Sequence, residues 1–281
     1  MPLRKVTIAF LLPAAYLLAQ PDLLAQPEKS AWEVLKAGLV DTNPLNRRQA
    51  VTATGSVGLD PEAIRQVEWA LQKDTDPLIR ATAAAELGEM KSRQSFPALK
   101  AALDDPGGEV GFAAAKALWD MGDKTGRGFI EDVVAGQQTA TDGGVKGALR
   151  RADRLRYDPK KMAVIGARSA SGALLGPFNI GVLAAEQVFK SGAVAVRMQA
   201  LNLLAEECDT QTFKLLEAAS TDDKTWAEKA AAAKALGRCA RPEAIPKLEE
   251  NLSNSNAAVR FMSAAAIIRL SEPRADASAS H

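Results

Sequence analysis

The sequence predicts an all-α protein, an α-solenoid of about six to seven helical hairpins with an irregular hairpin at its centre. Three observations lead to this fold class. Apolar residues make up 47% of the 281 residues but aromatic residues only 5%, and much of the apolar total is alanine, the strongest helix former. β-Branched and aromatic residues hardly ever alternate with polar ones over the length of a strand. The third observation is an internal repeat of about 32 residues.

The first 26 residues have the features of a secretory signal peptide. Two basic residues precede an apolar run over 6–18, and small residues follow the run. Ala19 and Ala25 each offer a cleavage edge. A buried first helix and an uncleaved membrane anchor are the alternatives, although the run is shorter than the ~20 residues that span a bilayer. We expect residues 1–26 to be removed and the mature chain to be periplasmic or secreted.

Six copies of the repeat align on a turn that begins with Asp, Ser or Asn. The turn residues are Asp41, Asp74, Asp105, Ser191, Asp223 and Asn254. The residues six positions later, mostly basic, are Arg47, Arg80, Gly111, Arg197, Lys229 and Arg260. A small residue usually stands nine positions after the turn residue, and an apolar residue usually stands thirteen after it. A period near 32 fits a pair of helices that stacks in a solenoid.

Each copy is expected to form a first helix, a turn and a second helix. Asp or Asn in the turn can accept hydrogen bonds from the free N–H groups of the second helix, and a proline such as Pro77 suits its first turn. The second helix, for example 78–90, is rich in alanine on the side that must approach its neighbours. Glycines that fit a left-handed cap close four of these helices: Gly55, Gly88, Gly122 and Gly237.

These residues resemble a known family. The pattern Asp74-x-x-Pro77-Leu78-Ile79-Arg80-x-x-Ala83-Ala84-x-x-Leu87-Gly88 resembles the HEAT repeat, in the short form of the phycobilisome-lyase-type HEAT-like repeats. Residues 229–237 and 256–260 repeat that signature, and the resemblance covers about 31–135 and 180–271. With its export signal, the chain resembles an exported bacterial HEAT-repeat protein.

The resemblance also implies a structural role for the turn and helix residues. In such families the turn Asp and the helix Arg form a ladder of contacts between neighbouring repeats. The ladder residues implied here are Asp41, Arg47, Asp74, Arg80, Arg197, Asp223, Lys229 and Arg260. Gly111 breaks the ladder in the third copy, and Ser191 and Asn254 replace the acid in two others.

The period fails between Asp105 and Ser191, where only a degenerate copy can be placed. Residues 145–157 fit an amphipathic helix with a basic side that carries Lys146, Arg150, Arg151 and Arg154. That side is either the solvated face of one more repeat helix or a contact for an acidic partner or a membrane surface. Residues 162–189 are glycine-rich and apolar, and they predict a hairpin packed into the solenoid, with membrane insertion or a dimer contact as alternatives.

The predicted organisation therefore has five parts. They are a signal peptide, N-terminal repeats, a degenerate repeat with an apolar hairpin, C-terminal repeats and a disordered tail, over residues 1–26, 27–136, 137–190, 191–271 and 272–281.

The amino-acid composition argues against most kinds of catalytic, metal-binding and nucleic-acid-binding site. The one histidine is the terminal His281, so neither a Ser-His-Asp arrangement nor a histidine metal cluster is available. Lysine and arginine total 35 against 34 acidic residues, which gives no overall field to gather nucleic acid. We expect no catalytic residue, no cofactor and no metal.

Cys208 and Cys239 lie at nearly the same place in adjacent copies, after the second helix. Export would permit a disulfide between them. Equivalent points in stacked helices lie about 8–10 Å apart, whereas a disulfide needs Cα atoms within roughly 7 Å. The sequence leaves a disulfide and two separate thiols as alternatives.

A solenoid presents a long curved surface, and binding follows from that shape. We expect a non-catalytic scaffold for protein–protein interaction, with another, unidentified protein as partner and no nucleic acid. One alternative, implied by the resemblance, is an accessory subunit of lyase type or of another enzyme. The other is a membrane-associated adaptor that uses residues 145–189.

Overall fold

The computed structural model describes residues 22–134, 192–222 and 225–271. Within these ranges the regular secondary structure is entirely helical, which confirms the all-α prediction. The first group of helices is α1 (Asp22–Leu39), α2 (Pro44–Val57), α3 (Pro61–Lys73), α4 (Pro77–Glu89), α5 (Phe96–Ala102), α6 (Gly108–Asp120) and α7 (Arg127–Val134). The second group is α11 (Gly192–Leu204), α12 (Thr210–Asp222), α13 (Trp226–Cys239), α14 (Ile245–Glu250) and α15 (Ala257–Ser271).

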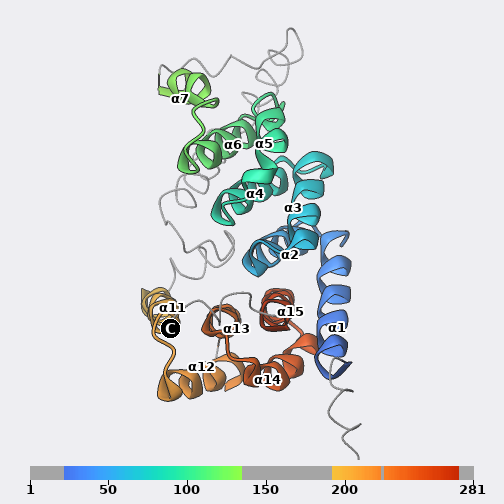
Figure 1. Ribbon diagram of the computed structural model, residues 1–281, viewed down its shortest axis with the longest axis vertical. Helices are drawn as coiled ribbons and strands as arrows, with labels where there is room; N and C mark the ends of the chain where they lie inside the picture. Colours follow the sequence, from blue (N-terminus) through green and yellow to red (C-terminus); the bar gives the residue numbers. More distant parts are fainter. Residues whose placement is uncertain (1–21, 135–191, 223–224, 272–281) are drawn as a thin grey trace, which may run out of the picture.

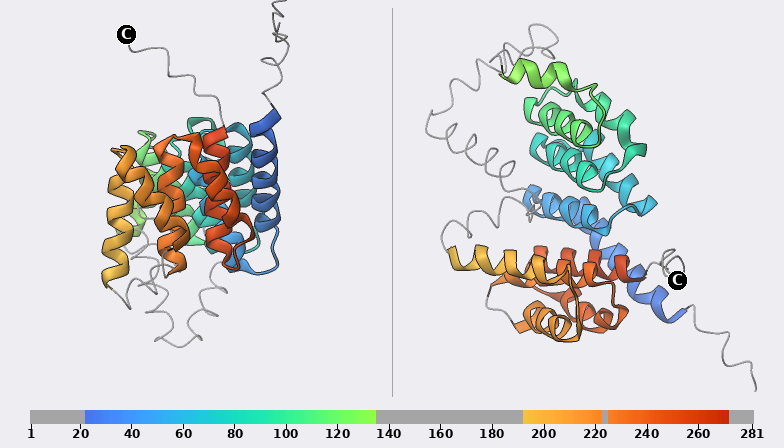
Figure 2. Two further views of the ribbon diagram at one scale, coloured as in Figure 1. Left: turned by 90° about the horizontal axis from the view of Figure 1, so that it is seen from below. Right: turned by 60° about the vertical axis from the view of Figure 1, so that its left-hand side comes forward.

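Consecutive helices pair into the hairpins α1–α2, α3–α4, α5–α6, α12–α13 and α14–α15. The second helices of neighbouring hairpins pack against one another, so that they form one layer and the first helices form the other (Figure 2). The whole assembly is an arc with α7 and α11 at its two ends (Figure 1). This architecture is the predicted α-solenoid.

The two ends of the described chain meet in the middle of the arc. Helix α15 packs against both α1 and α2, although it lies more than 200 residues away in the sequence. The order of second helices in space is therefore α11, α13, α15, α2, α4 and α6 (Figure 1). The stack of helices is continuous, but its order in space differs from the order in the sequence. The first described helix, α1, lies at the centre of the stack and not at one end.

The predicted turn chemistry sets the starts of the second helices. The Oδ1 atom of Asn43 accepts a hydrogen bond from the backbone N–H of Leu45 at 3.0 Å, and Oδ1 of Asp76 accepts one from Leu78 at 2.8 Å. Prolines occupy the first helical position in α2, α3 and α4, where no N–H is needed. These caps satisfy donors that would otherwise lie unpaired at the helix start.

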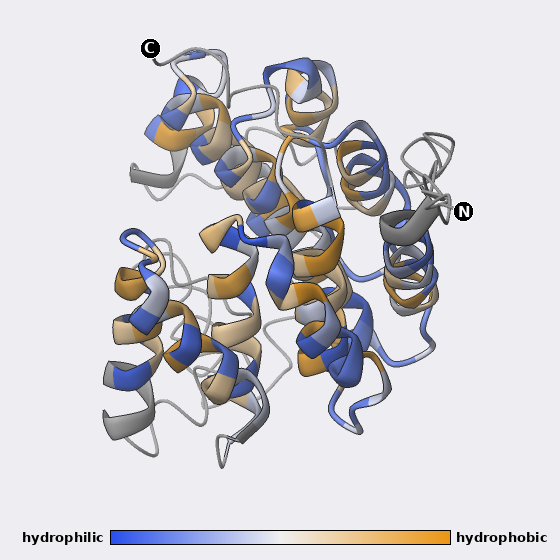
Figure 3. Ribbon diagram, turned by 60° about the horizontal axis from the view of Figure 1, so that its bottom comes forward, coloured by the Kyte–Doolittle hydropathy of each residue, from blue (hydrophilic) through white to orange (hydrophobic). Residues whose placement is uncertain are grey.

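Alanine allows the second helices to approach closely. The residues nine positions after the turn residue are fully buried in five copies: Ala50, Ala83, Ala114, Ala232 and Ser263. In α13, which lies between α11, α12 and α15, every residue from 230 to 233 is an alanine with no exposed surface. Figure 3 shows apolar residues gathered where helices face one another. Packing of small side chains over many short contacts thus forms the core.

The interpretation of the glycines as left-handed caps is wrong for Gly55, Gly88 and Gly237. Gly122 does have a positive φ, of 89°, just after α6, but the other three lie inside their helices. They are contact points between second helices, because a Cβ added at Gly88 would lie 2.8 Å from Ala117 Cβ. A Cβ added at Gly237 would lie 3.0 Å from Ala266 Cβ.

Helix α1 begins at Asp22, four residues before the predicted end of the signal peptide at residue 26. Cleavage after Ala25 would remove the first turn of α1, whereas cleavage after Ala19 would leave the helix whole. Residues 1–21 themselves lie outside the part of the chain that the structure describes. The same holds for the predicted basic helix, the apolar hairpin and the tail.

Candidate binding surface

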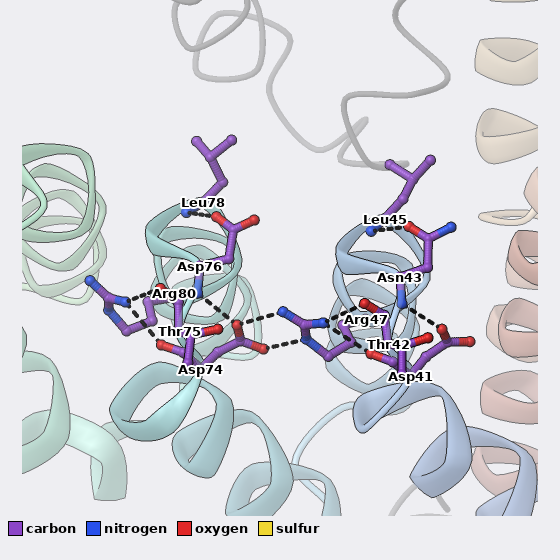
Figure 4. Close-up of polar contacts among 10 residues, drawn as sticks. All are labelled: Asp41, Thr42, Asn43, Leu45, Arg47, Asp74, Thr75, Asp76, Leu78 and Arg80. Atoms are coloured by element: carbon purple, nitrogen blue, oxygen red, sulfur yellow. Dashed lines mark hydrogen bonds and ion pairs between the residues drawn. The ribbon is translucent and has the colours of Figure 1, made fainter. Parts of the chain in front are cut away.

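The second helices line the inner side of the arc, and two of them carry exposed leucines at matching positions. Leu45 of α2 and Leu78 of α4 stand at the same place in adjacent copies. They are 37% and 41% exposed, and Figure 4 shows them pointing to the same side. Phe112 of α6 is exposed to a similar degree, one turn further along its helix. Exposed apolar side chains therefore occur on three adjacent second helices, at matching repeat positions in two of them.

Next to these leucines runs the Asp–Arg ladder. The guanidinium of Arg47 donates to both carboxylate oxygens of Asp74, the turn residue of the next copy, from Nε at 2.9 Å and from Nη2 at 3.1 Å. Its Nη1 donates to the backbone carbonyl of Asp41, in its own turn, at 2.9 Å. Arg80 makes the same contacts with Asp105, at 2.8 Å from both nitrogens. Each arginine thus ties its own turn to the following one, as Figure 4 shows for Arg47.

The ladder carboxylates also shape their own turns. Asp41, Asp74 and Asp105 each accept a hydrogen bond from the backbone N–H two residues later, at 2.7 to 2.9 Å. The Asp74 and Asp105 carboxylates raise the pKa of Arg47 and of Arg80 above the usual range. Both pairs are mostly buried, with side-chain exposures of 15% and 4% for the first pair and 13% and 12% for the second. They are therefore structural contacts.

The other residues implied for the ladder lie in altered settings. A Cβ at Gly111 would lie 2.5 Å from the ring of Phe129, so the α7 phenylalanine fills the place of an arginine in this copy. Nε of Arg197 lies 3.5 Å from Oε1 of Glu228, a carboxylate of the next copy. Lys229 is half-buried at the start of α13, and Asp223 lies outside the described residues.

Arg260 holds the ladder position in the last copy, which packs against the first copy. Nη1 of Arg260 donates to the backbone carbonyls of Asn254, at 2.7 Å, and Ser255, at 3.0 Å, as Arg47 does in its own turn. The pKa of Asp41 is lowered, first by the hydrogen bond from the N–H of Asn43 and also by the charge of Arg260. Arg260 thus repeats the contact that Arg47 makes with its own turn, and it acts on Asp41 through its charge.

Further contacts fix the junction between the two chain ends. Nη1 of Arg269 donates to the carbonyl oxygen of Val57 at 3.2 Å, at the electronegative end of α2. The ring of Phe261 packs over Gly38 of α1, where an added Cβ would lie 2.5 Å from the ring and 2.9 Å from Ala50 Cβ. Glycine is therefore required at position 38 by packing.

This contact gives a direct test of the junction. We expect Gly38→Ala to lower the free energy of unfolding by about 1–3 kcal/mol, because the new methyl group overpacks the contact with Phe261. Alanine is the better helix former by about 1 kcal/mol, so helix propensity alone predicts the opposite sign. Thermal unfolding measures the difference. Gly108→Ala is the control, since a Cβ at Gly108 meets nothing within 4 Å. Equal effects of the two substitutions would contradict the close contact.

A buried carboxyl group lies between α2 and α4. Glu86 is only 5% exposed and lies over Gly55, where an added Cβ would be 2.7 Å from Glu86 Cβ. Burial raises the pKa of Glu86 to about 8, and the nearby Glu89 adds to this. The charge of Lys234, on α13, and the hydroxyl of Thr52 act in the opposite direction. Glu86 is therefore mostly protonated at neutral pH.

Glu86 was not identified from the sequence as a buried acid, although its position in the repeat indicates one. The residue twelve positions after the turn is alanine in four copies, Ala53, Ala117, Ala235 and Ala266. All four are buried at 0–3%. A glutamate in a position that elsewhere holds buried alanine indicates a buried acid. The sequence does not indicate that Lys234 acts on the pKa of Glu86, because the distance between the two residues depends on the curvature of the solenoid.

The structure joins Cys208 and Cys239 in a disulfide with Cα atoms 5.4 Å apart. The two residues approach more closely than stacked helix axes because Cys208 lies in the turn after α11, outside any helix, while Cys239 is the last residue of α13.

The described residues are expected from the sequence to hold no metal site, and a membrane contact is one alternative for the chain. Among them, no group of three or more His, Cys, Asp and Glu side chains is placed to hold a metal ion. No helix there is long and apolar enough to cross a membrane. The predicted contact residues Lys146, Arg150, Arg151 and Arg154 lie outside the described ranges, as does His281.

A comparison with known protein families agrees with this fold. A family model described as HEAT repeats matches residues 64–152 and 214–278, together more than half of the chain. No curated protein matches the sequence. Among solved structures, human deoxyhypusine hydroxylase in complex with glycerol is similar at 20% identity, over 88% of this chain and 97% of that one, with a TM-score of 0.34. A similarity this low carries no inference about activity.

Proposed function

Because the chain belongs to the HEAT repeat family, we propose that it is a non-catalytic scaffold that binds another protein along the inner face of its second helices. Repeats of this family form an extended surface suited to protein–protein interaction. The observation that carries the proposal is the pair Leu45 and Leu78, which are exposed at the same repeat position and point to the same side. Apolar side chains that repeat along one face suit a partner laid across several hairpins.

We also propose that the scaffold acts outside the cytosol, in the periplasm or beyond the cell. Two features support this location. The N-terminal apolar run has the composition of a signal peptide. The Cys208–Cys239 bond is of a kind that persists in oxidising compartments.

Photo-crosslinking in the source cells tests the proposal. A photoreactive phenylalanine replaces Leu78 on the inner face or, as the matched control, Trp69, which is 46% exposed on the first helix α3. We expect a discrete crosslinked protein from position 78 and none from position 69, in the periplasmic or extracellular fraction. The mass of the captured chain tests cleavage after Ala19 or Ala25.

The double variant Leu45→Asp/Leu78→Asp should then reduce capture at least about tenfold, since each lost apolar contact costs on the order of 1 kcal/mol. Because both leucines are exposed, its melting temperature should stay close to that of the parent. Crosslinks from position 69 alone, or undiminished capture by the double variant, would refute binding at the inner face. Recovery in the cytosol alone would refute the proposed location.

A further inference from the structure

The helix α11 is held differently from every other described second helix. Its residues Met198 and Leu201, and Ala205 directly after it, are buried at 6% exposure. The helix packs against α13. The opposite side of α11 is open, because Leu203 is 58% exposed and Leu204 is 38% exposed. This helix stands at one end of the arc (Figure 1).

The repeat register shows that this exposure is specific to α11. Thirteen positions after the turn residue, the other copies have side chains with no exposed surface: Thr54, Leu87, Leu118, Leu236 and Ile267. The corresponding residue of α11 is Leu204. Nine positions after the turn residue, Ala200 is exposed, whereas its counterparts are fully buried. The described side chains of α11 therefore bury less apolar surface than the corresponding residues of the other copies.

The disulfide lies where this helix needs support. Cys208 follows the C-terminal end of α11, and Cys239 ends α13, so the bond ties the two helices together at that end. The ion pair beside it, Arg238 to Glu206, is 3.8 Å long and solvated, with side-chain exposures of 40% and 62%. Such a pair contributes little. Both cysteines are only partly buried, so a thiol reagent can reach them.

We propose that the Cys208–Cys239 disulfide is a redox-sensitive staple, and that a dithiol reductant which opens it releases α11 from α13. A thiolate of the reductant attacks one sulfur of the pair, the S–S bond breaks, and the second thiol of the reductant resolves the mixed disulfide. The reductant becomes a disulfide, and two electrons and two protons pass to the cysteines. The side of α13 that α11 covers is then exposed as a new apolar surface.

In the chain-entropy model, closing a loop of 31 residues stabilises a fold because it restricts the unfolded chain. The effect of the bond on α11 follows from its position, since α13 is the described helix against which α11 packs. The inner helices α2 and α4 have neighbours on both sides, so reduction should leave them in place. The inference does not depend on what the scaffold binds.

Hydrogen exchange followed by mass spectrometry tests the staple on the full chain, oxidised and after treatment with dithiothreitol. We expect amides of residues 197–204 to exchange at least tenfold faster after reduction, while those of α4 (77–89) keep their rates. The variant Cys239→Ser should show the same local increase without reductant, which excludes a direct effect of dithiothreitol.

Two results would overturn the proposal. Unchanged exchange in α11, in both the reduced protein and the variant, would show that packing alone holds the helix. Equal acceleration in α11 and α4 would show that the bond supports the whole fold and does not act on α11 in particular.

Discussion

At pH 8, we expect the variant Glu86→Gln to unfold at a urea concentration about 1–2 M higher than the parent protein, while at pH 5 the two should unfold at nearly the same concentration. The amide keeps the shape of the protonated carboxyl group but has no charge to bury. Glu86 lies over Gly55 between α2 and α4, with 5% of its surface exposed. The native structure therefore stabilises the neutral form.

The sign follows from the raised pKa. The ordinary pKa of glutamate is 4.5, and that of Glu86 in the folded protein is about 8. The neutral group's contribution to stability is fully present below pH 4.5 and is lost as the pH rises through 8. Within this window the free energy of unfolding should fall by about 1.4 kcal/mol per pH unit, or on the order of 5 kcal/mol in total. The charge of Lys234 opposes this loss.

Acidic side chains with a lowered pKa affect stability at a lower pH than Glu86 does. The pKa of Glu62 is lowered to about 2, chiefly by the hydrogen bond from Lys36, so its contribution is lost only as the pH falls below about 4. The matched control is Glu33→Gln, an exposed glutamate on α1 that does not act on Glu86, which should leave the free energy of unfolding at pH 8 almost unchanged. Parallel pH profiles for the parent and Glu86→Gln would show that the carboxyl group is not buried in solution.

The local parts of this fold could be predicted from the sequence because they repeat. The spacing of Asp74 and Arg80 marks a turn and a second helix, and the structure has α4 over Pro77–Glu89 where 78–90 was expected. Position in the repeat also identified Arg47 and Asp74 as members of the ladder, although the implied role came from a family resemblance. Local spacing determines local geometry, and the repeat supplies several copies of the same information.

The arrangement of the copies could not be predicted in the same way. Nothing in the period of about 32 residues indicates that the last copy stacks on the first, because each copy could have either neighbour. The contacts that decide this order join residues more than 200 positions apart, as Arg269 joins Val57. The glycines were misread for a related reason. A glycine near a helix end satisfies a cap pattern, but the close approach of a neighbouring helix at Gly88 depends on stacking.

Loss of one ladder carboxylate should have the second large effect on stability. We expect Asp74→Ala to lower the free energy of unfolding by about 3 kcal/mol, and the melting temperature by roughly 10 °C. Arg47 would keep a mostly buried charge that has lost both carboxylate contacts, and the N–H of Asp76 would lose its acceptor. Thermal and urea unfolding measure both quantities.

A solvated ion pair in the same solenoid provides the control. Lys116 and Asp120 are paired on α6 with half of each side chain exposed, so Asp120→Ala should cost no more than about 0.5 kcal/mol. The double variant Arg47→Met/Asp74→Ala should lose at least about 1 kcal/mol less than the sum of the two single variants, because no buried charge is then left unpaired. Additive losses, or a cost for Asp74→Ala as small as that for Asp120→Ala, would mean that the stack depends on its apolar contacts alone. The ladder would then be a recurring feature of the repeats that contributes little to the free energy of unfolding.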